Sequence, residues 1–107
     1  MKESALTKKI RLKLTEKFGG VWVKVPGGPY LITGFPDLIG VVEGYTIAIE
    51  VKLPGKEKTL TERQALVLKT LTEKGKCLAF MTTSAEDAID KVGAYLKLKT
   101  IPTWGLY

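Results

Sequence analysis

The sequence contains no histidine, and this absence excludes several kinds of catalytic site within the chain. Without imidazole there is no Ser-His-Asp triad, no histidine general base and no histidine–zinc site. Cys77 is the only cysteine, so an internal disulfide and a cysteine zinc cluster are excluded as well. Because Cys77 lies in an apolar stretch, we expect a buried, inert thiol there. The hydrolytic chemistry that remains depends on carboxylates, lysine and a metal ion.

The chain also lacks any apolar run close to the roughly 18–20 residues that cross a bilayer. The first residues, Met1-Lys2-Glu3-Ser4, show no apolar signal-peptide segment. We therefore expect no membrane partner, and a location in the cytoplasm or at the nucleoid. A length of 107 residues suits one domain with one modest core.

The chain has few acidic residues relative to basic ones: 11 aspartate and glutamate residues against 17 lysine and arginine residues, which gives a net charge of +6. A basic balance of this size favours an anionic partner, most often a nucleic acid. The alternative interpretation is charge that serves only solubility, and composition alone does not separate the two.

Hydrophobic periodicity predicts the order α-β-β-β-α-β-α. A helix over residues 3–18 has one apolar stripe, and glycines follow it. Strands are expected at 21–25, 38–42 and 45–53, with Gly44 turning the last two into a hairpin. A capping box at Thr61 and Gln64 begins a helix that runs to about Lys74. A strand at 76–82 and a helix at 84–98 complete an α/β fold, a mixed central sheet flanked by helices with the site at one edge.

Two carboxylates and a lysine are predicted to converge at one end of this sheet. Side chains alternate along a strand, so Glu50 and Lys52 lie on the same face. The hairpin brings Asp37, at the start of its first strand, near the end of the second. Two close carboxylates repel each other unless a cation lies between them, and a divalent metal satisfies that need with oxygen ligands. The alternative interpretation is an ion-pair cluster at the end of the sheet.

These residues carry a resemblance to a known family. Gly34-Phe35-Pro36-Asp37-Leu38, followed by Glu50-Val51-Lys52, resembles the PD-(D/E)XK nuclease signature. With the downstream Gln64, the pattern is more narrowly similar to the VRR-NUC branch, over roughly residues 1–85. The resemblance implies a restriction-endonuclease-like fold and one nuclease domain over residues 1–107. It also implies a bacterial protein, or a viral one in its host's cytoplasm.

The activity expected from this resemblance is Mg²⁺-dependent hydrolysis of DNA phosphodiester bonds, with Mn²⁺ able to substitute. The expected substrate is branched DNA such as a Holliday junction, cut by a homodimer that supplies two active sites. The apolar tail, with Trp104, Leu106 and Tyr107, is the candidate dimer contact. Two alternatives stay open: a non-catalytic DNA-binding module of the same fold, and a nuclease that acts on RNA.

Asp37 and Glu50 are the expected metal ligands, and the resemblance adds the backbone carbonyl of Val51. Lys52 is expected to orient the attacking water or to stabilise the transition state. Glu3 and Gln64 are each expected to support the site as a further ligand or as a water-positioning group. Each also has a structural explanation, since Glu3 can favour a helix N-terminus and Gln64 completes the capping box.

Several lysines are expected to contact DNA. Lys24, Lys56 and Lys58 are predicted to touch phosphates near the site. Lys8 and Lys9, with Arg11 and Lys13, form a charged run on the first helix that can also be a solvated face. The loop Pro26-Gly27-Gly28-Pro29 is either a flap beside the site or a plain connector.

Overall fold

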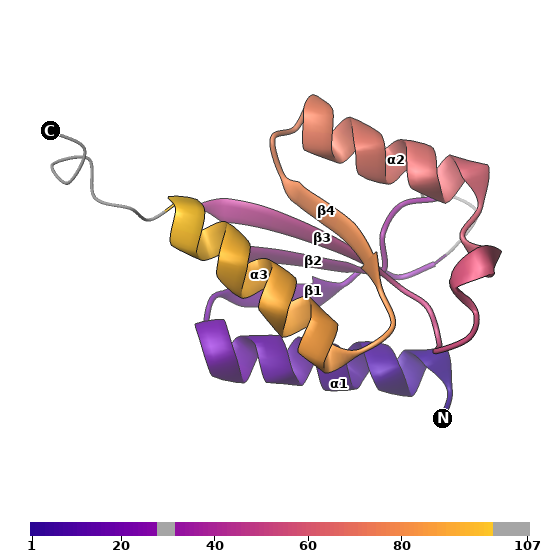
Figure 1. Ribbon diagram of the computed structural model, residues 1–107, viewed down its shortest axis with the longest axis horizontal. Helices are drawn as coiled ribbons and strands as arrows, with labels where there is room; N and C mark the ends of the chain where they lie inside the picture. Colours follow the sequence, from indigo (N-terminus) through magenta and orange to yellow (C-terminus); the bar gives the residue numbers. More distant parts are fainter. Residues whose placement is uncertain (28–31, 100–107) are drawn as a thin grey trace, which may run out of the picture.

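The computed structural model describes residues 1–27 and 32–99 of the chain and confirms the predicted order of elements (Figure 1). A short 3₁₀ helix, η1, lies in the polar stretch between the third strand and the second helix. The elements are α1 (Glu3–Phe18), β1 (Val21–Lys24), β2 (Leu38–Val42), β3 (Tyr45–Val51), η1 (Glu57–Thr59), α2 (Glu62–Glu73), β4 (Leu78–Thr82) and α3 (Ala85–Lys99).

The sheet is mixed, as predicted, with the strand order β1-β2-β3-β4. The pairs β1–β2 and β2–β3 are antiparallel, whereas β3 and β4 run parallel. Glu43 and Gly44 connect β2 to β3 and have φ angles of 51° and 85°. Positive φ at both positions is the condition of a type I′ turn, whose twist matches that of the hairpin strands. The turn therefore fixes the register that places Leu38 opposite Ile49.

Helices cover both faces of the sheet (Figure 1). Helices α1 and α3 pack against each other on one face, and α2 lies on the other, over β3 and β4. Ile47, Ile49 and Val51 of β3 belong to the core beneath α1 and α3. Because side chains alternate along a strand, Ala48 and Glu50 point to the face of α2. Every residue of β3 from Ile47 onward is buried, so a charged side chain at the end of this strand is energetically unfavourable.

Contacts of Trp22 and Gly40 determine how closely β1 packs against β2 and the end of α1. The Trp22 indole donates a hydrogen bond of 2.9 Å to the carbonyl of Gly19, just beyond α1. Its ring lies directly on Gly40 of β2, where an added Cβ would come within 2.3 Å of a ring carbon. Only glycine leaves room for this contact, so Gly40 holds the first two strands and α1 in a fixed relation.

Some element boundaries differ from the prediction. Strand β3 ends at Val51, so Lys52 and Leu53 follow it instead of belonging to it. Strand β4 begins at Leu78, after Lys76 adopts a φ of 57°, and Cys77 is half-buried rather than fully buried. The predicted tail contact at 100–107 and residues 28 and 29 of the loop from Pro26 to Pro29 fall outside the described residues. None of the helices in residues 1–27 and 32–99 combines the length and apolarity needed to cross a membrane.

Candidate metal centre

Asp37 is held by the backbone of both neighbouring strands. Its own carbonyl accepts a hydrogen bond of 2.8 Å from the N–H of Val25, just after β1. Its carboxylate oxygen Oδ2 accepts another of 2.8 Å from the N–H of Val51, at the end of β3. The preceding Pro36 is fully buried and restricts the backbone at this point. One carboxylate oxygen is therefore held by the backbone, and the carboxyl group of Glu50 lies within hydrogen-bonding reach of Asp37.

Glu50 is an almost fully buried carboxyl group, with 2% of its surface exposed. Among the described residues, its Oε2 is the one fully buried side-chain oxygen or nitrogen without a hydrogen-bond partner. Burial raises the pKa of Glu50 to about 9, helped by a hydrogen bond and repulsion from Asp37, against the opposing charge of Lys52. Without a cation, the folded protein therefore keeps Glu50 protonated at neutral pH.

A cavity of about 330 Å³ opens onto these two carboxyl groups. Its wall is formed by the segment before β2, the end of β1, Glu50 and the first turn of α2. Asp37, Glu50 and Gln64 all line it, so the fold brings together three residues that are far apart in the sequence.

Gln64 fulfils the capping role and lines the cavity at the same time. Its backbone N–H donates to the Thr61 hydroxyl over 3.0 Å, and its side-chain Oε1 accepts from the Thr61 N–H over 2.9 Å. The only oxygen of this side chain is thus engaged by the backbone. The side chain still offers its NH₂ group, so Gln64 is suited to donate to a water or a phosphate oxygen.

Lys52 follows β3 directly, and 8% of its surface is exposed. Its backbone N–H donates 3.0 Å to the carbonyl of Thr82 at the end of β4, which continues the parallel pairing by one residue. The charge of Lys52 lowers the pKa of Glu50, although burial outweighs it. Lys52 therefore lies within electrostatic reach of the carboxyl pair.

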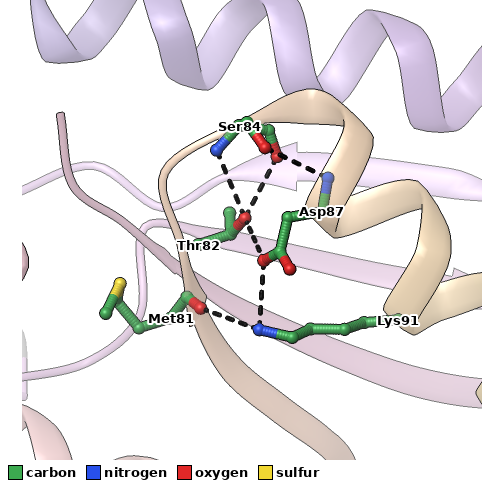
Figure 2. Close-up of polar contacts among 5 residues, drawn as sticks. All are labelled: Met81, Thr82, Ser84, Asp87 and Lys91. Atoms are coloured by element: carbon green, nitrogen blue, oxygen red, sulfur yellow. Dashed lines mark hydrogen bonds and ion pairs between the residues drawn. The ribbon is translucent and has the colours of Figure 1, made fainter. Parts of the chain in front are cut away.

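The β4 end that holds Lys52 is itself fixed by a polar network (Figure 2). The Thr82 hydroxyl lies 2.7 Å from Oδ2 of Asp87, and Lys91 pairs with the same oxygen at 3.0 Å. The Ser84 hydroxyl accepts a hydrogen bond of 3.1 Å from the Asp87 N–H, which caps the start of α3. Sequence reasoning missed this network, because its members serve the turn and show no catalytic spacing.

Arg63 connects the Asp37 segment to α2. Its Nε donates a hydrogen bond of 3.2 Å to the carbonyl of Thr33. Gly34 has a φ of 82°, and a Cβ there would lie 2.7 Å from Cγ of Arg63. The glycine thus permits both the backbone conformation and the close approach of α2. This contact sets the position of Gln64 relative to Asp37.

The remaining predicted site residues lie around this centre without lining its cavity. Glu3 is exposed rather than on the buried side of α1, and its charge makes the smallest contribution to the raised pKa of Glu50. Lys56 and Lys58 are exposed at η1, and Lys24 and Lys8 line a separate groove between α1 and β1. Lys9 faces another groove, between α1 and α3.

The donors at this centre suit a hard divalent cation such as Mg²⁺. Within residues 1–27 and 32–99, no three acidic, cysteine or histidine side chains form a metal-binding cluster. Mg²⁺, however, is commonly held by one or two carboxylates and keeps several water ligands. Asp37 and Glu50 supply the two carboxylates, and a cation would give the isolated Oε2 of Glu50 the partner that it lacks. The residues present therefore fit the ion.

Comparison with known proteins gives no independent assignment: no family model matches the chain, and no curated protein matches it.

The raised pKa of Glu50 predicts how stability depends on pH in the absence of metal. The folded state binds this proton more tightly than the unfolded state, so stability should fall as pH rises from the ordinary carboxyl range towards about 9. Glu50→Gln, which stays neutral, should flatten this decline. Thermal unfolding with a chelator, measured at intervals from about pH 5 to about pH 9, checks the difference between the two proteins.

Glu16→Gln is the matched control for this measurement, because Glu16 is an exposed carboxylate on α1. It should leave the slope of stability against pH as in the wild type. If the wild type and Glu50→Gln follow parallel curves, then Glu50 does not carry its proton in the folded state.

Proposed function

We propose that this protein is a metal-dependent phosphodiesterase that hydrolyses DNA. The observation that carries the proposal is the buried, unpartnered Oε2 of Glu50 beside Asp37 on an open cavity. A buried polar atom without a partner is unfavourable, and among the buried side-chain nitrogen and oxygen atoms of residues 1–27 and 32–99 it stands alone. Such an arrangement is typical of a site built for a charged ligand.

In this proposal Asp37 and Glu50 hold Mg²⁺, with the backbone carbonyl of Val51 as a further ligand and Mn²⁺ as a substitute. The ion would acidify a bound water and offset the negative charge that develops on the phosphorus centre. Asp37 is positioned for this role by its two backbone contacts. Glu50 has to lose its proton when the ion binds, because only the carboxylate is a ligand.

In this proposal Lys52 and Gln64 supply the hydrogen-bond donors to the attacking water and to the phosphate. In the proposal the Lys52 ammonium orients the attacking water or stabilises the charge of the transition state, and its electrostatic effect on Glu50 supports this role. Its backbone is anchored to Thr82, so the side chain begins from a fixed point. The NH₂ group of Gln64 can hold a water or a phosphate oxygen at the cavity wall. Glu3 acts from a distance, through its charge.

The finer assignment is a restriction-endonuclease-like fold of the PD-(D/E)XK superfamily, in its VRR-NUC branch. The element order, the mixed sheet and the positions of Asp37, Glu50 and Lys52 at one end of the hairpin support it. We propose branched DNA as the substrate and a homodimer as the active form. Resolving a four-way junction needs two symmetric incisions, and a two-fold dimer supplies both sites.

A cleavage panel tests the function. Duplex, flap, fork and four-way junction DNA are incubated with purified protein and Mg²⁺, Mn²⁺ or a chelator, and light scattering gives the mass of the same sample. We expect metal-dependent cleavage, highest on the junction, with paired cuts by a dimer. Binding without cleavage in any metal would favour the non-catalytic module. Preferential cutting of RNA would replace DNA as the substrate, and paired cuts by a monomer would contradict the dimer.

A further inference from the structure

A basic groove of about 630 Å³ lies between α1 and β1, next to the candidate metal centre but distinct from its cavity. Four cationic side chains line it: Lys2, Lys8 and Arg11 from the N-terminal part of the chain, and Lys24 from β1. None of its lining residues is acidic. The groove therefore concentrates positive charge in a concave surface, which attracts anions more strongly than a flat one.

The charge of this groove is not neutralised within the protein. In the described part of the chain, the one ion pair closer than 4.0 Å joins Lys91 and Asp87 of α3, and neither residue lines the groove. The N-terminal turn of α1 also lies at the groove, and the N-terminus of a 16-residue helix adds a partial positive charge. Four cations from the N-terminal segment and from β1 therefore meet at one concave surface whose lining contains no acidic residue.

Two residues that line the groove are covalent neighbours of residues that act on the metal centre. Lys24 precedes Val25, whose N–H binds the Asp37 carbonyl and which lines the cavity of the site. Lys2 precedes Glu3, whose charge acts on Glu50. A polyanion held in the groove would therefore contact residues that are adjacent in sequence to Val25 and Glu3.

We propose that the α1–β1 groove binds the phosphodiester backbone of one strand of duplex DNA beside the scissile bond. Lys2 and Arg11 are nine residues apart on or next to α1, about 14 Å along the helix axis. That length corresponds to about four nucleotides of one strand at a rise of 3.4 Å. The inference rests on the proposed nuclease function, and it specifies where the uncut part of the substrate lies.

The same helix provides a matched control surface. Lys9, Lys13 and Lys17 are also on α1, but they line the hollows on its α3 side, where Glu16 and Glu86 are present. These lysines are as exposed to solvent as Lys8. If the basic residues of α1 serve only solubility or long-range attraction, both sets should be equivalent.

The experiment compares the groove variant Lys8→Ala/Arg11→Ala/Lys24→Ala with the control Lys9→Ala/Lys13→Ala/Lys17→Ala, which changes the net charge equally. Binding to a labelled DNA duplex is measured by fluorescence anisotropy in a chelator, so that no cleavage occurs. At about 0.1 M salt we expect the groove variant to bind on the order of 10²-fold more weakly. Its log–log salt slope should be shallower by about 2.7, and the control should keep the wild-type slope.

Thermal unfolding of each variant shows whether it is folded, and Lys8→Ala/Lys24→Ala avoids the half-buried Arg11 if the triple variant is unstable. Equal loss of affinity in both sets, or an unchanged groove variant, would overturn the proposal. An RNA duplex or a single strand that competes better than duplex DNA would overturn the assignment of the occupant. If the protein cleaves DNA but the groove substitutions leave DNA binding unchanged, only this inference is refuted, because binding is measured without metal. If the groove substitutions weaken DNA binding but the protein cleaves no substrate, only the proposed nuclease function is refuted.

Discussion

Asp37→Asn and Glu50→Gln should each abolish metal-dependent cleavage and leave the fold intact. Each substitution removes a charged ligand with little change of shape. Asparagine can still accept the Val51 N–H, and glutamine is neutral, like the protonated Glu50 of the metal-free protein. Since metal catalysis contributes several kcal/mol, the rate should fall by at least about 10³-fold. Single-turnover cleavage with Mg²⁺, alongside calorimetric titration of the ion, measures both effects.

DNA binding should survive in these two variants, because the proposed groove lies outside the cavity that they alter. In Asp37→Asn it should even tighten slightly, since a negative charge near the phosphates is lost, whereas Glu50→Gln replaces a group that is already neutral without metal. Glu62→Gln, an exposed position in the first turn of α2, is the control and should cleave at the wild-type rate. If Asp37→Asn or Glu50→Gln also cleaves at that rate, then the assigned centre is wrong.

The element order could be predicted because its signals are local. The fourfold spacing of Leu6, Ile10 and Leu14 defines the buried stripe of α1, and all three are buried. Gly44 closes the hairpin, and Thr61 with Gln64 forms the predicted capping box. Each of these features depends on a few neighbouring residues, so no knowledge of the tertiary structure was needed.

The details of the site could not be predicted, because they depend on contacts across the fold. The polar face of β3 suggested two charged groups side by side, but the strand ends between Glu50 and Lys52. The burial of Glu50 results from α2 packing over β3, which no spacing in the sequence reveals. The two roles of Gln64 were also beyond sequence reasoning. Only the folded structure shows that its side chain can cap α2 and line the cavity at the same time.

The lysines of α1 illustrate a further limit of sequence reasoning. Lys8 and Lys9 are adjacent and carry the same charge, and the sequence assigned both to DNA. Helix packing sends Lys8 to the groove beside β1 and Lys9 to the groove beside α3. A helix turns about 100° per residue, so neighbouring side chains are separated by the orientation of the helix on the sheet. Only the packed structure decides which of them faces the candidate centre.

Lys52→Met should reduce the cleavage rate by a factor on the order of 10², the usual effect of losing one transition-state donor. Methionine is preferable to alanine, because the Lys52 stem is buried and a long apolar side chain preserves its packing. The backbone bond to Thr82 does not involve the side chain and should persist. Comparison of the thermal unfolding of Lys52→Met with that of the wild type checks that the fold is unchanged.

A second measurement separates a catalytic Lys52 from a merely structural one. Lys52 lowers the pKa of Glu50, so its removal should raise that pKa further and shift the cleavage rate to higher pH. At a pH where Glu50 is ionised, metal binding should persist or tighten, because a positive neighbour of the ion is gone. Lys52→Arg keeps the charge and should leave the pH profile near that of the wild type. Loss of metal binding at every pH in Lys52→Met would show instead that Lys52 only holds the carboxyl groups in place.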